Sequence, residues 1–248
     1  MSAGLDPETG AILLIDKPVG WTSFNALAKI RSALLALCGH RVKVGHAGTL
    51  DPLASGLLIL GTGQCTKQLQ ALADEDKTYT ATLRLGQSTP SFDAETEVVL
   101  ERPWEHLDTR AVQAVLRRFT GEIMQRPPDF SAKRYRGERA YFLARAGETV
   151  RFTPIPLTIH ELKLMRLEGP EATVHVRCSK GTYVRSLAHD IGEALGCGAH
   201  LVALRRTASG GFQVSDARTP EQWSQWLDAW AVERRAQAEN RPAGPIGP

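Results

Sequence analysis

The spacing of hydrophobic residues along this chain predicts strands and helices in alternation. Residues 77–85 (KTYTATLRL) and 172–178 alternate polar with apolar positions, as half-buried strands do. Residues 11–15 and 57–60 are short apolar runs typical of buried strands. Helical spacing covers longer stretches, at residues 23–37, 64–73, 109–119, 183–195 and 220–235. This mixture excludes an all-α or an all-β chain, and no internal repeat is visible.

Several of the predicted helices carry end signals of their own. Thr22 or Ser23 can cap the helix that begins at residue 23, because their hydroxyls can accept hydrogen bonds from its first free N–H groups. Asp108 can cap the helix over 109–119 in the same way. Gly196 is placed to end the helix over 183–195.

The last predicted helix carries a stripe of large apolar residues. It starts at the cap Thr219, followed by Pro220 and by Gln222 as capping-box partner. Helical spacing then places four side chains on one face: Trp223, Trp226, Leu227 and Trp230. We interpret this stripe as packing against the domain rather than as a surface for stacking bases. Residues 236–248 (AQAENRPAGPIGP) have the composition of a disordered tail.

Two segments interrupt the periodic pattern. Residues 86–108 and 125–155 are polar, rich in proline and charge and weakly periodic, as loops or lids are. We therefore expect one domain over residues 1–235, long enough to bury a substantial core, with an insertion over about 86–155.

Composition and net charge are ordinary for a globular protein, and only the distribution of the charged residues along the chain bears on function. The net charge of the 248 residues is +3, so a bulk signal for nucleic-acid binding is absent. Basic residues nonetheless gather in two groups, Arg126, Lys133, Arg134, Arg136, Arg139, Arg145 and Arg151, and Arg177, Lys180, Arg185, Arg205 and Arg206. Such groups suit contacts with phosphates, and a solvated protein face explains them equally well.

The sequence does not support several other classes of function. The early apolar run over 11–15 is too short for a signal peptide or a membrane span, so we expect a cytoplasmic protein with no membrane partner. The four cysteines include no C-x-x-C pair and the seven histidines no H-E-x-x-H spacing, so we expect reduced thiols and no metal. There is neither a G-x-G-x-x-G motif nor a P-loop, so we expect no cofactor.

The most informative stretch is residues 45–58 (GHAGTLDPLASGLL), which sets one acid, Asp51, in a turn of small and apolar residues. Its glycines permit positive φ or the close approach of another chain, and Pro52 holds Asp51 extended. Small side chains leave room beside the carboxylate for a flat group, and the strand over 57–60 anchors the turn. A loop of this kind can present a catalytic acid, although composition alone favours an ordinary Asp-Pro turn.

The same stretch resembles the active-site motif of the TruB family of pseudouridine synthases, GH-x-G-x-LDP-x-A-x-G-x-L. The resemblance continues, in the family's order, through residues 15–23 (IDKPVGWTS), 77–79 (KTY), 127–132 (PPDFSA), 178–185 (CSKGTYVR), 196–200 (GCGAH) and 204–206 (LRR). A single match of this kind can arise by chance, whereas the whole ordered set does not.

This resemblance implies a pseudouridine synthase fold, an α+β domain whose mixed, largely antiparallel sheet is flanked by helices and whose insertion grips RNA. It implies isomerisation of uridine 55, in the T-loop of tRNA, to pseudouridine. The T-arm stem-loop of tRNA would be the partner, with no cofactor, no metal and no protein partner required, and the chain is expected to be a monomer. Such an enzyme must flip its target base out of the RNA stack.

Three residues match catalytic positions of the family. Asp51 matches the catalytic aspartate, and Arg185 the arginine that pairs with it, because a buried carboxylate needs a neighbouring cation to stay charged. Tyr79 matches the tyrosine that stacks on the flipped base, which is also a candidate for proton transfer. Without the resemblance, residue type and sequence context favour a surface or phosphate-binding role for Arg185 and a place in the core for Tyr79.

Further positions match residues around the substrate. His46 matches the histidine that enters the RNA loop and helps to displace the target base. Leu204 resembles the apolar residue that closes the other side of the pocket, while Lys17 and Pro18 resemble a support for the active-site turn. The other candidates for substrate binding lie in the basic segment or in the CSKGTYVR motif, at Lys133, Arg134, Lys180 and Tyr183.

The chain departs from the family pattern in three places. Phe130 stands where the P-P-x-Y-S-A motif has Tyr, and Arg134 stands where Lys is usual, so the substrate contacts of this segment stay open. About forty residues follow Gly210, fewer than an independent domain needs, so we expect the PUA domain of many members to be missing or reduced to a helix.

Two other functions remain as alternatives. One is an RNA chaperone that folds tRNA with the same surface, although chaperoning requires no buried acid. The other is a related synthase that acts on ribosomal RNA under guide control. The sequence also leaves open whether Asp51 attacks the uracil ring, attacks the sugar or removes a sugar proton.

Overall fold

The structure is a computed structural model that describes residues 6–131, 133–148, 150 and 152–239. The chain forms two compact units. The first comprises Met1–Pro52, Gly56–Ala73 and Gln213–Pro248, and the second comprises Leu53–Ser55 and Asp74–Phe212. The single domain expected over residues 1–235 stays a prediction.

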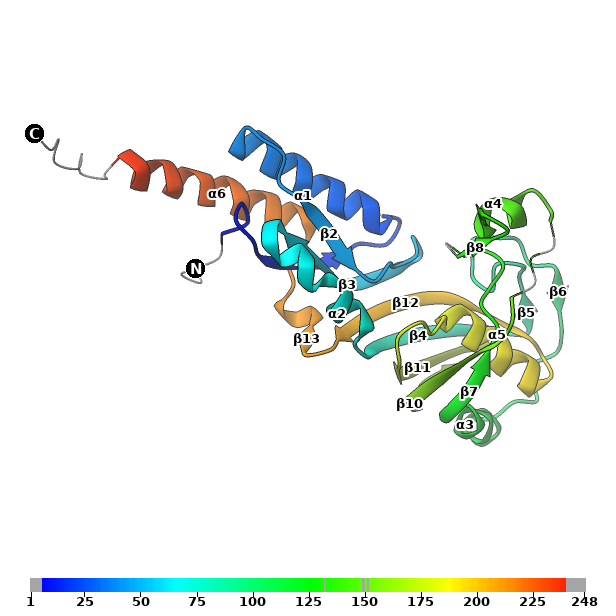
Figure 1. The fold of residues 1–248 in the computed structure, drawn as a ribbon. Helices are drawn as coiled ribbons and strands as arrows, with labels where there is room; N and C mark the ends of the chain where they lie inside the picture. Colours follow the sequence, from blue (N-terminus) through cyan, green and yellow to red (C-terminus); the bar gives the residue numbers. More distant parts are fainter. Residues whose placement is uncertain (1–5, 132, 149, 151, 240–248) are drawn as a thin grey trace, which may run out of the picture. The chain divides into compact units, whose positions relative to one another are not determined.

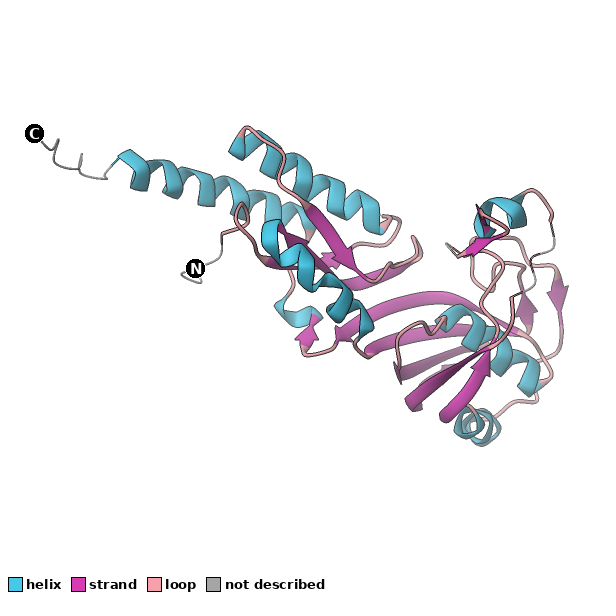
Figure 2. Ribbon diagram, in the orientation of Figure 1, coloured by secondary structure: helices cyan, strands magenta, loops and turns pink. Residues whose placement is uncertain are grey.

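The first unit combines a small antiparallel sheet with two packed helices (Figures 1 and 2). Strand β3 (Ala54–Thr62) pairs with β1 (Ile12–Lys17) and with β2 (Val44–Ala47). Helices α1 (Ser23–Cys38) and α6 (Pro220–Glu239) contact each other and β1. The predicted strand over residues 57–60 is confirmed as the buried centre of β3, since all four side chains are at most 1% exposed.

The start of α1 follows the predicted cap, whereas the glycine at its end was not predicted. Thr22 forms a capping box with Asn25 at the start of α1, and Gly39, with φ of 73°, ends the helix. The helix predicted over 64–73 consists of a 3₁₀ segment, η1 (Gly63–Gln68), followed by α2 (Leu69–Asp74).

Helix α6 closes the first unit by returning to its first strand. Thr219 and Gln222 form the predicted capping box. Trp223 and Leu227 are buried, and the Trp223 indole donates a hydrogen bond of 2.7 Å to the Leu14 carbonyl, which confirms the packing interpretation. The helix runs past its expected end at 235, because residues 236–239 (AQAE) favour helix. The rest of the predicted tail, 240–248, lies outside the described residues.

The second unit is built on an antiparallel sheet with the strand order β12-β4-β11-β10-β7. These strands are β12 (Ala199–Ser209), β4 (Lys77–Leu85), β11 (Glu171–Cys178), β10 (Ile155–Glu168) and β7 (Gly121–Gln125). Helix α5 (Val184–Leu195) packs against β12 and α3 (Thr109–Arg118) against β10, and the two helices touch, so they share one face of the sheet (Figure 1). The predicted α+β class with a largely antiparallel sheet is confirmed.

The segment expected as an insertion, residues 86–155, is only partly separate from this sheet. Its middle part, α3 and β7, belongs to the core, because β7 pairs with β10 and α3 covers β10. The remainder consists of short elements, β5 (Gln87–Ser88) with β6 (Leu100–Glu101), β8 (Arg134–Tyr135) with β9 (Glu138–Arg139), and α4 (Ala140–Arg145). The weak periodicity of residues 125–155 thus reflects one pair of two-residue strands and the short helix α4.

Gly192 marks the closest approach of α5 to the sheet and gives a test of this packing. A Cβ there would lie 2.0 Å from the Ala199 amide nitrogen and 2.4 Å from the Gly198 carbonyl carbon. Because both are backbone atoms, Gly192→Ala must displace α5. We expect the free energy of unfolding to fall by about 1–3 kcal/mol, measured by urea denaturation. Gly211→Ala is the control, since nothing lies within 4 Å of its Cβ; equal stabilities would contradict this packing.

Candidate active site

Asp51 lies in the turn between β2 and β3, and backbone hydrogen bonds hold both of its neighbours. The Ser23 hydroxyl accepts a bond of 2.8 Å from the Leu50 N–H and donates one of 3.1 Å to the Leu50 carbonyl. The Gly20 N–H donates to the Pro52 carbonyl at 2.8 Å. The half-buried Asp51 side chain is therefore carried by a backbone that is fixed on both sides.

Lys17 and Pro18 lie in the segment that supports this turn. Lys17 is fully buried, and its ammonium donates to the carbonyls of Pro18, at 2.9 Å, and Trp21, at 2.6 Å. A buried ammonium must be compensated by such bonds, so the lysine and the loop from Pro18 to Trp21 fix each other. Gly20, which bonds to Pro52, lies inside that loop.

Glycines give the Asp51 turn its backbone shape. Gly48 and Gly56 have φ of 83° and 97°, in the left-handed region that glycine adopts without strain. A Cβ at Gly45 would lie 2.7 Å from Cδ1 of Leu69, so the absence of a side chain at this position lets Leu69 pack close to the backbone. His46 follows it on β2, opposite Leu60, with a half-buried side chain.

Tyr79 and Leu204 lie on the same buried face of the second unit's sheet. Tyr79 and Ala81 belong to the buried set of alternating side chains on β4. The strand register pairs Tyr79 with Arg206 and Ala81 with Leu204 on β12. Tyr79 and Leu204 are thus diagonal neighbours, about 7–8 Å apart between backbones and within reach of one flat ring.

Arg185 is anchored at three points in the first turn of α5. Its Nε lies 3.5 Å from Oδ2 of Asp93, while Nη1 donates to the Ser91 carbonyl at 3.2 Å and Nη2 to the Phe130 carbonyl at 3.0 Å. The side chains of Arg185 and Asp93 are 5% and 3% exposed. Because a buried guanidinium has to be neutralised and hydrogen-bonded, these partners determine where Arg185 lies.

Asp93 is a site residue that the sequence interpretation missed. Its carboxylate accepts a hydrogen bond of 2.6 Å from the Ser91 hydroxyl and one of 3.0 Å from the Glu95 N–H. The Thr89 hydroxyl donates to the Asp93 carbonyl at 2.6 Å. An acid flanked by serine and threonine is typical of turns built on side-chain hydrogen bonds, and this was the signal available in the sequence.

Tyr183 and Phe130 contribute through their backbones. The side-chain amide of the buried Gln125 accepts from the Tyr183 N–H at 2.8 Å and donates to the Tyr183 carbonyl at 3.1 Å. Gln125, which was not predicted, thereby holds the residue that precedes α5. Phe130 bonds to Arg185 with its carbonyl, so the departure from the family's tyrosine at this position leaves that bond intact.

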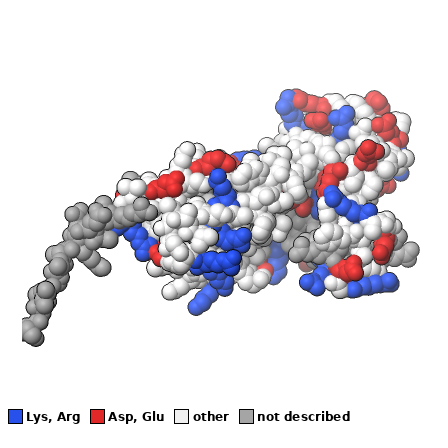
Figure 3. All heavy atoms as spheres, turned by 90° about the horizontal axis from the view of Figure 1, so that it is seen from above, with Lys and Arg blue, Asp and Glu red and all other residues white. Residues whose placement is uncertain are grey.

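The remaining predicted binding residues lie near the surface of the second unit. Arg134 is exposed and donates to the Gly137 carbonyl at 3.2 Å. The Lys133 ammonium lies 5.9 Å from the ring centre of Phe152, and Lys180, 59% exposed, pairs with Asp74 at 3.1 Å. Figure 3 shows Lys and Arg in several groups with Asp and Glu between them, so charge on this face is interleaved rather than continuous.

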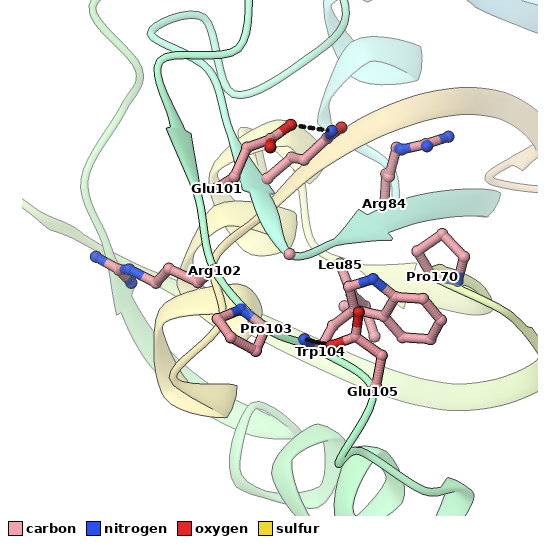
Figure 4. Close-up of a pocket in the computed structure, with 10 residues that line it drawn as sticks. Arg84, Leu85, Glu101, Arg102, Pro103, Trp104, Glu105 and Pro170 are labelled. Atoms are coloured by element: carbon pink, nitrogen blue, oxygen red, sulfur yellow. Dashed lines mark hydrogen bonds between the residues drawn. The ribbon is translucent and has the colours of Figure 1, made fainter.

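A pocket of about 360 Å³ in the second unit lies away from these residues (Figure 4). Its lining includes Arg84, Leu85, Arg102, Trp104 and Pro170. The Trp104 indole packs over Gly86, where a Cβ would lie 2.6 Å from the ring. Tyr79 and Leu85 are six residues apart on β4, roughly 20 Å along a strand, so the pocket is separate from the group around Tyr79.

Two further findings concern the described part of the chain. It contains no group of three or more His, Cys, Asp or Glu side chains that could hold a metal ion. None of its helices has the length and apolar character needed to cross a membrane.

Two family models match the chain in succession. One, described as TruB family pseudouridylate synthase (N terminal domain), matches residues 36–184, which include Asp51 and Tyr79. The other, described as tRNA pseudouridylate synthase B C-terminal domain, matches residues 185–239, which include Arg185 and Leu204.

Curated relatives match over most of the chain. The tRNA pseudouridine synthase B of Phocaeicola vulgatus is 47% identical over 227 residues, which cover 91% of this chain and 97% of that protein. The protein of the same name from Burkholderia lata is 53% identical over 218 residues, covering 88% of this chain and 66% of that protein.

Solved structures share the fold over most of this chain and are themselves longer. A chain of a Cbf5-Nop10-Gar1 complex matches with a TM-score of 0.69 and 30% identity over 91% of this chain. A chain of an H/ACA RNP bound to a substrate RNA containing 2′-deoxyuridine matches with a TM-score of 0.67 and 28% identity over 92%. This chain spans 56% of the length of each. On these matches, together with the Asp51 turn, the chain belongs to the TruB family of pseudouridylate synthases.

Proposed function

We propose that this protein converts a uridine in the T-loop of tRNA, uridine 55, to pseudouridine. The observation that carries the proposal is the Asp51 turn, in which one acid is held between two backbone positions fixed by Ser23 and Gly20. Relatives from two bacteria bear the name tRNA pseudouridine synthase B, and the proposal extends that substrate to this chain.

The reaction breaks the bond between the ribose C1′ and the uracil N1, turns the base and joins C1′ to C5. C5 loses a proton and N1 gains one, so the product is an isomer and no cofactor has to enter the balance. Asp51 is the proposed catalytic group, acting as nucleophile or as base. The target base must first leave the RNA stack, at a cost of a few kcal/mol, with His46 as the residue proposed to help displace it.

Arg185 is the cation proposed to keep Asp51 charged. Its three anchors, Asp93 and the carbonyls of Ser91 and Phe130, support this role because they hold the guanidinium in one orientation before substrate arrives. Preorganised charge of this kind costs no reorganisation during the reaction. Tyr79 and Leu204 are proposed to enclose the uracil ring, Tyr79 by stacking on it, which is worth roughly 1–3 kcal/mol per base.

The T-arm stem-loop is the proposed partner. We also propose that the protein acts in the cytoplasm as a monomer and needs no protein partner. The exposed Arg134 and the neighbouring Lys133 are proposed to contact phosphates of the stem. Lys180 and Tyr183 are proposed to contribute contacts nearer to Arg185.

Tritium release tests the function itself. Unmodified tRNA labelled with tritium at C5 of uridine loses the label when C5 forms the new bond, and mapping of the product then identifies the nucleotide. Release at a single T-loop uridine supports the proposal. Release only from ribosomal RNA with a guide, or RNA refolding without any release, would instead support one of the two alternatives.

Asp51→Asn should abolish turnover while RNA binding survives. Asparagine keeps the shape of the side chain and loses the charge and basicity, and such groups contribute about 10²–10⁴-fold to rate. The measurement is single-turnover tritium release alongside stem-loop affinity. Asp228→Asn, on an exposed position of α6, makes the same chemical change as a control and should match wild type. An Asp51→Asn enzyme with a substantial fraction of wild-type rate would remove Asp51 from the mechanism.

Binding of an isolated T-arm stem-loop should be nearly as tight as that of whole tRNA and should weaken steeply with salt. Each phosphate neutralised in a duplex adds about 0.9 to the slope of log affinity against log salt. Arg134→Gln with Arg136→Gln should therefore lower the slope by about 1.8 without changing the catalytic step.

The control for this salt series is Arg110→Gln with Arg118→Gln, which removes the same charge from exposed positions of α3. It should leave the slope near that of wild type. Equal slopes for both double variants, or a large preference for whole tRNA, would show that RNA is gripped elsewhere.

A further inference from the structure

Helix α5 presents two side chains to the loop at residues 89–96. Arg185 and His189 are four residues apart, so they lie on the same face one turn from each other. Arg185 contacts Ser91 and Asp93 on either side of Phe92, and His189 contacts Phe92 itself. Three consecutive residues of the loop are therefore held by two side chains of a single helix.

The contact between His189 and Phe92 is a stacked pair of rings. Their centres are 4.0 Å apart and their planes differ by 16°. Burial lowers the pKa of His189 and so favours the uncharged imidazole in this stack. Its buried Nδ1 makes no hydrogen bond within the described part of the chain.

Phe92 also has a backbone conformation that needs outside support. Its φ of 64° lies in the left-handed region, which bulky side chains rarely adopt and which persists only where the surroundings enforce it. The Leu201 N–H, on β12, donates a hydrogen bond of 2.9 Å to the Phe92 carbonyl. The stack on His189 holds the side chain from α5.

This conformation determines the direction of both neighbours of Phe92. The Ser91 carbonyl accepts from Arg185, and the Asp93 carboxylate pairs with it at 3.5 Å. A relaxation of φ at Phe92 toward negative values would turn the Ser91 carbonyl and the Asp93 side chain away from their present directions. The guanidinium would then lose the anchors that fix its orientation.

We propose that the Phe92–His189 stack holds the 89–96 loop in its strained form and thereby positions Arg185 for the isomerisation. His189 is thus a positioning residue that acts through Phe92 and Asp93 rather than on the substrate. The inference rests on the proposed function, because it assigns to that reaction a residue outside the group that contacts the base.

The test compares His189→Ala with His189→Phe. Alanine removes the stack, so the single-turnover rate on T-arm stem-loop at saturating RNA should fall by between about tenfold and a hundredfold, the effect of misplacing a catalytic group by an ångström or so. The KM for the stem-loop should change by less than about twofold, since the phosphate contacts are untouched. Phenylalanine keeps a flat ring and should restore most of the rate.

Two further variants separate positioning from folding. Phe92→Gly deletes the ring at a position whose φ glycine adopts without strain, so it should lose as much rate as His189→Ala while the protein still folds. The double variant, His189→Ala with Phe92→Gly, should be no slower than either single variant, because each substitution removes the same contact. His175→Ala is the matched control on β11, where this half-buried histidine lies 3.8 Å from Glu161; it should keep wild-type rate.

Amide exchange gives a readout that does not depend on turnover. The Leu201 amide, bonded to the Phe92 carbonyl, should exchange faster in His189→Ala and return toward wild type in His189→Phe. A wild-type rate in His189→Ala, or a loss of rate that His189→Phe does not restore, would overturn the positioning role. Wild-type protein that releases no tritium from the stem-loop would instead contradict the proposed function, which keeps the two failures distinguishable.

Discussion

The ion pair between Arg185 and Asp93 ties together three segments that are far apart in the sequence. The guanidinium joins the loop at residues 89–96, the backbone at Phe130 and the first turn of α5. Both charges are almost completely buried, and removing one partner of such a pair typically costs about 3–5 kcal/mol because the other charge is left uncompensated. The position of Arg185 is therefore a property of the whole second unit, and the role proposed for this residue depends on that rigidity.

The Asp51 turn is held by different means. Its neighbours are fixed by hydrogen bonds from residues 20–23, and its shape depends on glycines with positive φ. The glycines and Pro52 lie within the stretch at 45–58 itself, which explains why that stretch could be interpreted without a structure, whereas Ser23 lies 27 residues before Leu50. A proline and three glycines have local consequences that follow from their own stereochemistry.

The same distinction explains which parts of the fold were predicted. Residues 77–85 alternate strictly and form β4, and the caps Thr22, Asp108 and Thr219 begin helices where expected. Strands β7, β10 and β12 went unassigned. Register shifts in β10 and β12 break the alternation that marks a strand, and β7 is only five residues long. Asp93 and Gln125 were missed for a related reason, since their partners on and beside α5 are distant in sequence and burial of a polar side chain leaves no pattern.

The single-turnover rate of Asp93→Asn on saturating T-arm stem-loop tests the account most directly. Asparagine fits the same space and can still accept from the Ser91 hydroxyl and the Glu95 N–H, but it no longer neutralises Arg185. The account predicts a loss of about 10²–10³-fold, the scale of losing one preorganised electrostatic contact, with stem-loop affinity retained. A folded Asp93→Asn protein with a rate within about twofold of wild type, far short of that loss, would contradict it.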